Sequence, residues 1–212
     1  YQKQLIDDKD VEAVAASLRS DFLTTGPKIK EFEEKFASYV GAEYAIAVSS
    51  GTAALHLTCL AAELKKGDEL ITSPLTFLAS ANCAIYCGAK PKFADIDEQG
   101  LIDLKKTKET LTKKTKIVIP VHYGGMPCNI KNFRENLKTI IIEDACHAFG
   151  ASHNGEKIGS CKYSDMAVFS FHPVKHITTG EGGMITTNKK ELYEKLIALR
   201  SHGVFHSRKP TE

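Results

Sequence analysis

The 212-residue sequence has almost no excess of charge of either sign. Its 28 lysines and arginines stand against 26 aspartates and glutamates, which gives a net charge of +2. Proteins that bind nucleic acid or a membrane surface electrostatically carry a concentrated basic excess, so we expect neither partner. Long apolar runs are also missing, since none approaches the roughly 20 residues of a membrane span. The sequence begins with Tyr1 rather than Met and shows no signal-peptide pattern, and we expect a cytoplasmic protein.

Paired cysteine motifs are absent as well. The six cysteines are dispersed through apolar stretches, and no CxxC pair occurs among them. Cys83 and Cys87 are four residues apart on an expected helix and so share a face, but without a CxxC pair they do not indicate a metal site. The sequence therefore predicts free, mostly buried thiols of a cytosolic protein and no metal site.

Helical and strand patterns alternate along the chain. The hydrophobic content of 42% is enough for the core of one large domain. Short apolar runs separated mostly by helical or loop segments are typical of a mainly parallel sheet with helices on both faces. The link from Phe171 to Gly183 is too short for a helical crossover, so we expect the last strand to be antiparallel. The seven predicted strands are 44–48, 69–72, 92–96, 116–121, 139–142, 166–171 and 183–187.

The N-terminal segment of about 1–40 is predicted to be helical. A first helix over 10–20 carries an apolar stripe, a second over 29–40 stops at Gly41, and a final helix runs from about 189 to 200. The stripe consists of Val11, Val14, Ala15 and Leu18. The last residues, 207–212, are polar and basic without a closing element, so the end is either a flexible tail or a cut through a longer protein.

Ligands of open α/β sheets bind at the carboxyl ends of the strands, and the segment Ser49-Ser50-Gly51-Thr52-Ala53-Ala54 falls there. It follows the first strand and opens a helix. A glycine lets the backbone approach a ligand, and the free N–H groups of a helix N-terminus stabilise an anion, above all phosphate. An ordinary hydroxyl N-cap is the alternative interpretation.

Two acids, Glu143 and Asp144, end a buried strand. A carboxylate at Asp144 can pair with a protonated ring nitrogen, and the alternative is a solvated turn acid. His147, three residues on, can hydrogen-bond to or stack on a flat cofactor, or is simply a satisfied polar residue.

Lys175 follows another apolar strand. A lysine among apolar and aromatic side chains can lose its charge and form a Schiff base, although most lysines are solvated. The turn Gly180-Glu181-Gly182-Gly183 lacks the GxxxxGK pattern and is interpreted as structural. An anion cradle, a ring-nitrogen acid and a Schiff-base lysine occur together in the order that an enzyme using pyridoxal phosphate (PLP) requires.

These segments resemble the PLP-dependent sugar-nucleotide aminotransferases of the DegT/StrS family over the whole chain. The matching segments are LTTG from Leu23, SGTAAL from Ser50, PLTFLAS from Pro74, EDACH from Glu143 and FSFHPVK from Phe169. The stretch FSFHPVKHITTGEGG, together with LRSHG from Leu199, is particularly similar to the 4-aminotransferases of the pseudaminic acid pathway.

The resemblance implies the large domain of the type I (aspartate aminotransferase) fold, over residues 1–212, without the C-terminal small domain of the family. It implies that Lys175 forms the Schiff base and moves the proton, that Asp144 pairs with the pyridine nitrogen, and that His147 lies near the ring hydroxyl. Phe77 would pack on the ring. The phosphate would be held by Gly51, Thr52, Ala53 and Ser170, and the sugar nucleotide by Tyr1, Asp21, Phe22, Leu23 and Thr24.

By the same resemblance the enzyme is a homodimer with a shared active site. It would move an amino group from glutamate to C4 of a UDP-linked 4-keto-6-deoxy sugar. An enzyme that forms 4-amino-4-deoxy-arabinose is the alternative within the family. A related sugar dehydratase has His where Lys175 stands, a non-catalytic relative would lack Lys175 or Asp144, and no GxGxxG follows the first strand to support a nicotinamide dehydrogenase.

Overall fold

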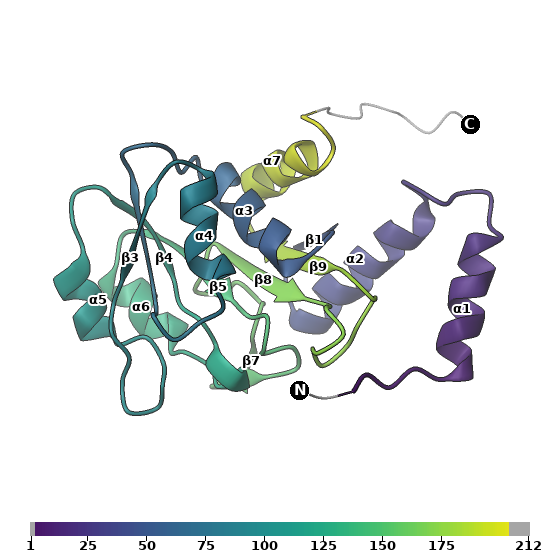
Figure 1. Cartoon of the computed structure of the whole chain (residues 1–212), viewed down its shortest axis with the longest axis horizontal. Coiled ribbons are helices and arrows are strands. Elements are labelled where there is room, and N and C mark those ends of the chain that lie inside the picture. The colour runs from purple at the N-terminus through teal and green to yellow at the C-terminus, as the bar shows by residue number, and fades with distance from the viewer. Residues whose placement is uncertain (1–2, 204–212) are drawn as a thin grey trace.

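A seven-stranded sheet forms the centre of the computed structural model, which describes residues 3–203 (Figure 1). The strand order is β1-β9-β8-β5-β4-β2-β3, and β9 alone runs antiparallel to its neighbours. The mainly parallel sheet and its antiparallel last strand were both predicted and are confirmed. The strands are β1 (Tyr44–Val48), β2 (Glu69–Thr72), β3 (Lys90–Phe93), β4 (Thr115–Ile119), β5 (Ile140–Asp144), β8 (Met166–Ser170) and β9 (Gly183–Thr187), and β6 (Ser152–His153) and β7 (Glu156–Lys157) form a separate hairpin.

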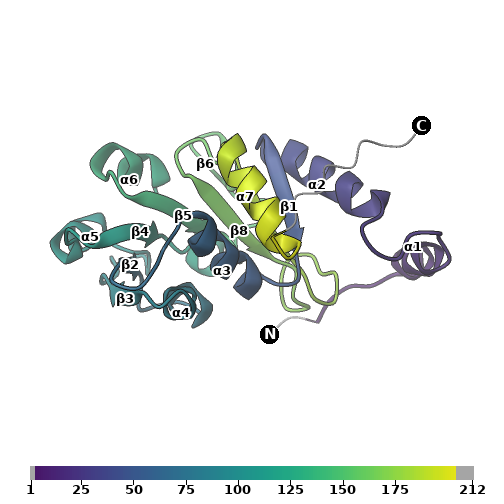
Figure 2. The same ribbon diagram turned by 90° about the horizontal axis from the view of Figure 1, so that it is seen from above.

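Helices cover both faces of the sheet because successive buried side chains of its strands point to opposite sides. Leu70, for example, packs in the cluster that contains α3, α4 and α7, whereas Ile71 packs with residues around α6. Figure 2 shows these layers from above. The helices are α1 (Asp8–Leu18), α2 (Pro27–Val40), α3 (Gly51–Ala61), α4 (Ala79–Tyr86), α5 (Leu104–Thr110), α6 (Ile130–Asn136) and α7 (Lys190–Arg200), with a short 3-10 turn η1 (Tyr123–Gly125).

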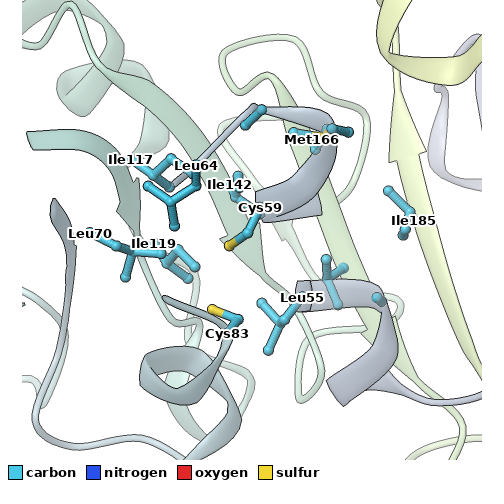
Figure 3. Close-up of a cluster of buried hydrophobic side chains, with 14 of the residues drawn as sticks. Leu55, Cys59, Leu64, Leu70, Cys83, Ile117, Ile119, Ile142, Met166 and Ile185 are labelled. Atoms are coloured by element: carbon cyan, nitrogen blue, oxygen red, sulfur yellow. The ribbon is translucent and has the colours of Figure 1, made fainter. Parts of the chain in front are cut away.

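The largest core cluster fixes α3 against the sheet. Figure 3 shows Leu55 and Cys59 of α3 beside Cys83 of α4, among isoleucines of β4 and β5. These side chains are almost fully buried, and burying one side chain of this size contributes about 1.5–3 kcal/mol. The start of α3 is therefore held in a defined position. All six cysteines are free thiols, and four of them are buried.

Several element boundaries differ from the predicted ones. The strand predicted over 92–96 is β3, Lys90–Phe93, because the chain turns after Phe93: Ile96 forms only an isolated bridge with Ile102, and Asp97 accepts backbone hydrogen bonds from its own turn. The first helix begins at Asp8 and ends at Leu18 rather than covering 10–20, because the side chains of Asp7 and Asp10 form a capping box.

The apolar stripe of α1 is present but is not buried by residues 3–203. Val14, in the middle of the stripe, is 61% exposed, and α1 contains no buried residue. Figures 1 and 2 both show α1 at one end of the molecule, beyond α2 and away from the sheet. Within residues 3–203, none of the helices combines the length and the apolar character that crossing a membrane needs.

Candidate active site

Three of the predicted segments meet at one edge of the sheet. Val48, Asp144 and Ser170 are the last residues of β1, β5 and β8. Gly183 begins the antiparallel β9 and pairs with Val48 on one side and with Ser170 on the other. The carboxyl ends of the parallel strands and the start of β9 therefore lie together, where ligands of such sheets bind.

The start of α3 lies close to Ser170. A Cβ atom on Gly51 would come within 2.9 Å of Ser170 Cβ and 3.0 Å of Cys146 Sγ, and one on Gly183 would come within 2.6 Å of the Ser50 carbonyl. Glycine is required at both positions because any larger residue would push these segments apart. This packing places the first backbone amides of α3 beside the Ser170 side chain, an arrangement that we call the cradle.

Ser50 caps α3, so the ordinary N-cap interpretation is correct for this residue. Its Oγ accepts a hydrogen bond of 3.0 Å from the Ala53 amide. The first amides of a helix have no intrahelical acceptor, which leaves the N–H groups of Gly51 and Thr52 for an anion. The cap is therefore compatible with the predicted anion site, although the Ala53 amide is already used. The Thr52 side chain is exposed at this edge.

Asp144 is not a solvated turn acid. It is 5% exposed, its Oδ2 accepts a hydrogen bond of 2.6 Å from Ser80 Oγ, and its Oδ1 accepts one of 3.2 Å from the Cys146 amide. Sequence reasoning assigned no role to Ser80. The available signal was its place at the end of the segment PLTFLAS from Pro74, which matches the family.

Glu143, the other acid at the end of β5, points to the opposite face of the sheet. Its Oε2 accepts from His122 Nε2 at 2.9 Å and its Oε1 accepts from Ser164 Oγ. His122 Nδ1 in turn accepts from the Cys128 amide, so the ring is bound on both sides. Glu143 therefore ties the connection after β4 to the loop before β8, and Asp144 alone faces the candidate site.

Lys175 and His147 lie near Asp144. Lys175 is half-buried in the loop after β8, and its amide donates to the His172 carbonyl at 2.9 Å. Burial and the nearby charge of Lys175 lower the pKa of His147, while Asp144 acts in the opposite direction. The imidazole of His147 is accordingly neutral at neutral pH, and it lies 6.3 Å from the Tyr123 ring between centroids.

Phe77 and the predicted sugar-nucleotide residues are at the surface. Phe77 is 71% exposed, three residues before Ser80, so its loop borders Asp144. Residues 21–24, between α1 and α2, are all exposed. Thr24 lines a groove of about 1160 Å³ together with Ser49 and Ala53, whereas Asp21, Phe22 and Leu23 do not line it. Tyr1 lies outside the described residues.

The close packing at Gly51 gives a first prediction. Gly51→Ala is expected to destabilise the protein by about 1–3 kcal/mol, the usual effect of overpacking, because the new methyl group meets Ser170 Cβ. Urea unfolding measures the change. The double variant Gly51→Ala/Ser170→Gly removes one of the two contacts and is expected to recover part of the loss. A single variant as stable as the native protein would contradict the described packing.

The side chains at this edge fit PLP. The cradle, formed by the start of α3 and Ser170, has the amide and hydroxyl donors that a phosphate dianion needs. A buried carboxylate at Asp144 suits the protonated pyridine nitrogen, and a primary amine at Lys175 suits the aldehyde. Among the described residues, no group of three or more His, Cys, Asp or Glu side chains is placed to hold a metal ion.

Comparison with known proteins shows the family of the chain. Residues 4–211 match the DegT/DnrJ/EryC1/StrS aminotransferase family. A UDP-4-amino-4,6-dideoxy-N-acetyl-β-L-altrosamine transaminase of Campylobacter jejuni is 41% identical over 98% of this chain and 56% of its own length. A UDP-4-amino-4-deoxy-L-arabinose–oxoglutarate aminotransferase of Shewanella sediminis is 40% identical over 94% of this chain and 52% of its own length.

Solved aminotransferase structures also superpose closely on this chain. PseC of Helicobacter pylori, an aminotransferase of pseudaminic acid biosynthesis, superposes with a TM-score of 0.91 at 33% identity and covers 98% of this chain and 57% of its own. NtdA of Bacillus subtilis, with bound pyridoxamine phosphate, superposes with a TM-score of 0.82 at 33% identity, covering 91% of this chain and 45% of its own. The chain spans about half the length of these relatives. It belongs to the DegT/DnrJ/EryC1/StrS aminotransferase family.

Proposed function

We propose that the whole protein is a PLP-dependent aminotransferase that acts on a nucleotide-linked keto sugar. The observation that carries this proposal is the convergence of the Gly51 cradle, the buried carboxylate of Asp144 and the Lys175 amine at one sheet edge. The presence of Lys175 and Asp144 supports an aminotransferase over a PLP-dependent dehydratase or a non-catalytic relative.

When bound, PLP supplies a carbonyl for imine formation and an electron-withdrawing ring. The Lys175 amine would hold the cofactor at its aldehyde and would move a proton to and from the reacting carbon. The Asp144 carboxylate accepts a hydrogen bond from the ring N–H and stabilises its positive charge. The Gly51 and Thr52 amides and the Ser170 hydroxyl hold the phosphate. Phe77 would pack on the ring, and His147 would lie beside the ring hydroxyl.

We propose glutamate as the amino donor and a UDP-linked 4-keto-6-deoxy sugar as the acceptor, as in pseudaminic acid biosynthesis. The similarity to the Campylobacter jejuni transaminase supports this substrate, and the Shewanella sediminis relative supports a 4-keto-arabinose alternative. The groove that Thr24 shares with Ser49 and Ala53 gives a nucleotide sugar access beside the cradle.

Mass spectrometry of the products formed by the full-length protein tests the substrate. The protein is incubated with glutamate and either the UDP-4-keto-6-deoxy sugar or the UDP-4-keto-pentose. An amino sugar from the first supports the proposal, and one from the second alone supports the arabinose-type enzyme. No amino sugar from either, with PLP bound, would contradict both assignments.

We also propose a homodimer with a shared active site. A stable obligate interface should bury more than about 2,000 Å². Of the apolar residues that border the site motifs, Phe171 is buried in the core and unavailable, whereas Phe77 is exposed and Leu75 is half-buried. Light scattering of the full-length protein is expected to give the mass of a dimer, and a PLP-bound monomer with full activity would contradict the shared site.

The phosphate cradle gives a second prediction. Thr52→Ala and Ser170→Ala each remove a hydroxyl donor to the phosphate, and a hydrogen bond to a charged group contributes about 1.5–3 kcal/mol. Each variant is therefore expected to weaken PLP binding by about ten-fold or more, measured by fluorescence titration of the apoprotein. Ser152→Ala, in the distant hairpin, serves as the control. Unchanged affinity in both cradle variants would indicate that the phosphate binds elsewhere.

A further inference from the structure

Three oxygen-bearing side chains, those of Thr76, Ser80 and Asp144, form a hydrogen-bonded series at the candidate site. Thr76 Oγ1 lies 2.7 Å from Ser80 Oγ, and Ser80 Oγ lies 2.6 Å from Asp144 Oδ2. Ser80 is fully buried, and Thr76 is half-buried between Ser80 and the surface. Ser80 belongs to the first turn of α4, while Asp144 ends β5, so the contact joins two separate elements.

The direction of these hydrogen bonds follows from the number of protons. An ionised carboxylate only accepts, and a hydroxyl has a single proton to donate. Ser80 therefore donates to Asp144, and Thr76 must donate to Ser80. Hydrogen bonds in such a series polarise and strengthen one another.

The main chain of Asp144 is held independently of Ser80. Its amide donates to the Pro120 carbonyl at 2.9 Å, and its carbonyl accepts from the His122 amide at 3.0 Å. The Cys146 amide, the other group bound to the carboxylate, is at the longer distance of 3.2 Å. Removing the Ser80 hydroxyl therefore removes the shorter of the two hydrogen bonds to the Asp144 carboxylate and leaves the strand in place.

We propose that Thr76 and Ser80 are positioning residues, whose hydroxyl relay orients the Asp144 carboxylate and keeps the shared proton on the ring nitrogen of PLP. The inference rests on the proposed function, because it assumes that Asp144 faces that nitrogen. A hydroxyl that donates to a carboxylate favours its ionised form. The relay thus favours a protonated ring beside a charged carboxylate over a neutral ring beside a neutral acid. Since Phe77 adjoins Thr76, the relay also joins the ring-packing loop to Asp144.

The test is ¹⁵N NMR of the full-length protein reconstituted with PLP labelled at the pyridine nitrogen. Ser80→Ala and Ser80→Val are expected to move the resonance toward that of unprotonated pyridine and to lower kcat by about ten-fold, the effect of losing one hydrogen bond to a charged group. Ser80→Thr keeps the hydroxyl at nearly the volume of Val and is expected to restore both. Ser73→Ala, which removes another buried hydroxyl of the same connection that bonds only to Leu75, is the control.

The outcomes separate this inference from the proposed function. Asp144→Asn is expected to move the resonance at least as far as Ser80→Ala, and failure to move it would overturn the assigned role of Asp144. A resonance that responds to Asp144→Asn but is the same in Ser80→Ala, Ser80→Val and the native protein would overturn the relay alone. If the Ser80 variants do not fold, Thr76→Val tests the outer end of the relay. A smaller shift of the ¹⁵N resonance in the same direction, which Thr76→Ser reverses, supports the relay. An unchanged resonance in Thr76→Val overturns it.

Discussion

Lys175→Ala is expected to lower the rate of transamination by at least about 10³-fold, within the range for a positioned proton-transfer group. The loss should be this large because the same Nζ atom both binds the cofactor and moves the proton. Lys175→Arg retains a positive charge, but a guanidinium stays protonated and does not form a Schiff base. This variant is therefore expected to be equally inactive. Single-turnover kinetics of the full-length protein measure the rate.

Borohydride reduction identifies the lysine directly. The native protein should become covalently labelled with the cofactor on the peptide that contains Lys175, and Lys175→Ala should remain unlabelled. Lys190→Ala is the matched control, because Lys190 is an exposed lysine whose ion pair with Glu194 lies on the surface and contributes little. A label on another lysine of the native protein would show that the Schiff base forms elsewhere.

Asp144→Ala is expected to retain PLP while transamination slows by about 10²–10³-fold, as when a preorganised electrostatic partner is removed. The phosphate cradle is formed by other segments, which is why binding should persist. The buried position of Asp144 and its two hydrogen-bond donors indicate that the carboxylate is oriented before a ligand arrives. Stopped-flow absorbance measures the rate, and equilibrium dialysis measures retention of the cofactor.

Asp97→Asn provides the control for this experiment. Asp97 is an acid of a surface turn, where its Oδ1 accepts from the Gln99 and Leu101 amides, and the amide oxygen of Asn can replace that acceptor. We expect unchanged turnover for Asp97→Asn. Near-native turnover of Asp144→Ala would show that the buried carboxylate serves only the structure of the loop.

The sheet, and the meeting of the candidate segments at the carboxyl ends of its strands, could be predicted from the sequence because both depend on local patterns. Short apolar runs identify strands, and a glycine or an acid directly after a parallel strand must lie where the carboxyl ends of the strands meet. The antiparallel direction of β9 followed from the length of one loop. The roles of Lys175 and Asp144 came from the family resemblance, and the structure adds that Asp144 is buried and hydrogen-bonded.

The remaining features depend on contacts that no local pattern encodes. Ser80 and Asp144 are 64 positions apart in the sequence, so their hydrogen bond requires the packing of α4 against the sheet. Glu143 and Asp144 are adjacent acids, and only the alternation of faces along β5 separates a structural carboxylate from a site carboxylate. The stripe of α1 shows the converse case, since a regular helical pattern does not reveal which surface covers it.

The position of β3 at one end of the strand order limits how sheets of two copies of this protein can pair there. An open strand edge offers free N–H and C=O groups to a strand of another molecule. Here the edge strand reads Lys90-Pro91-Lys92-Phe93: the proline has no N–H to donate, and the two lysines would meet like charges across an antiparallel junction. Growth of one continuous sheet through several molecules is therefore disfavoured at β3.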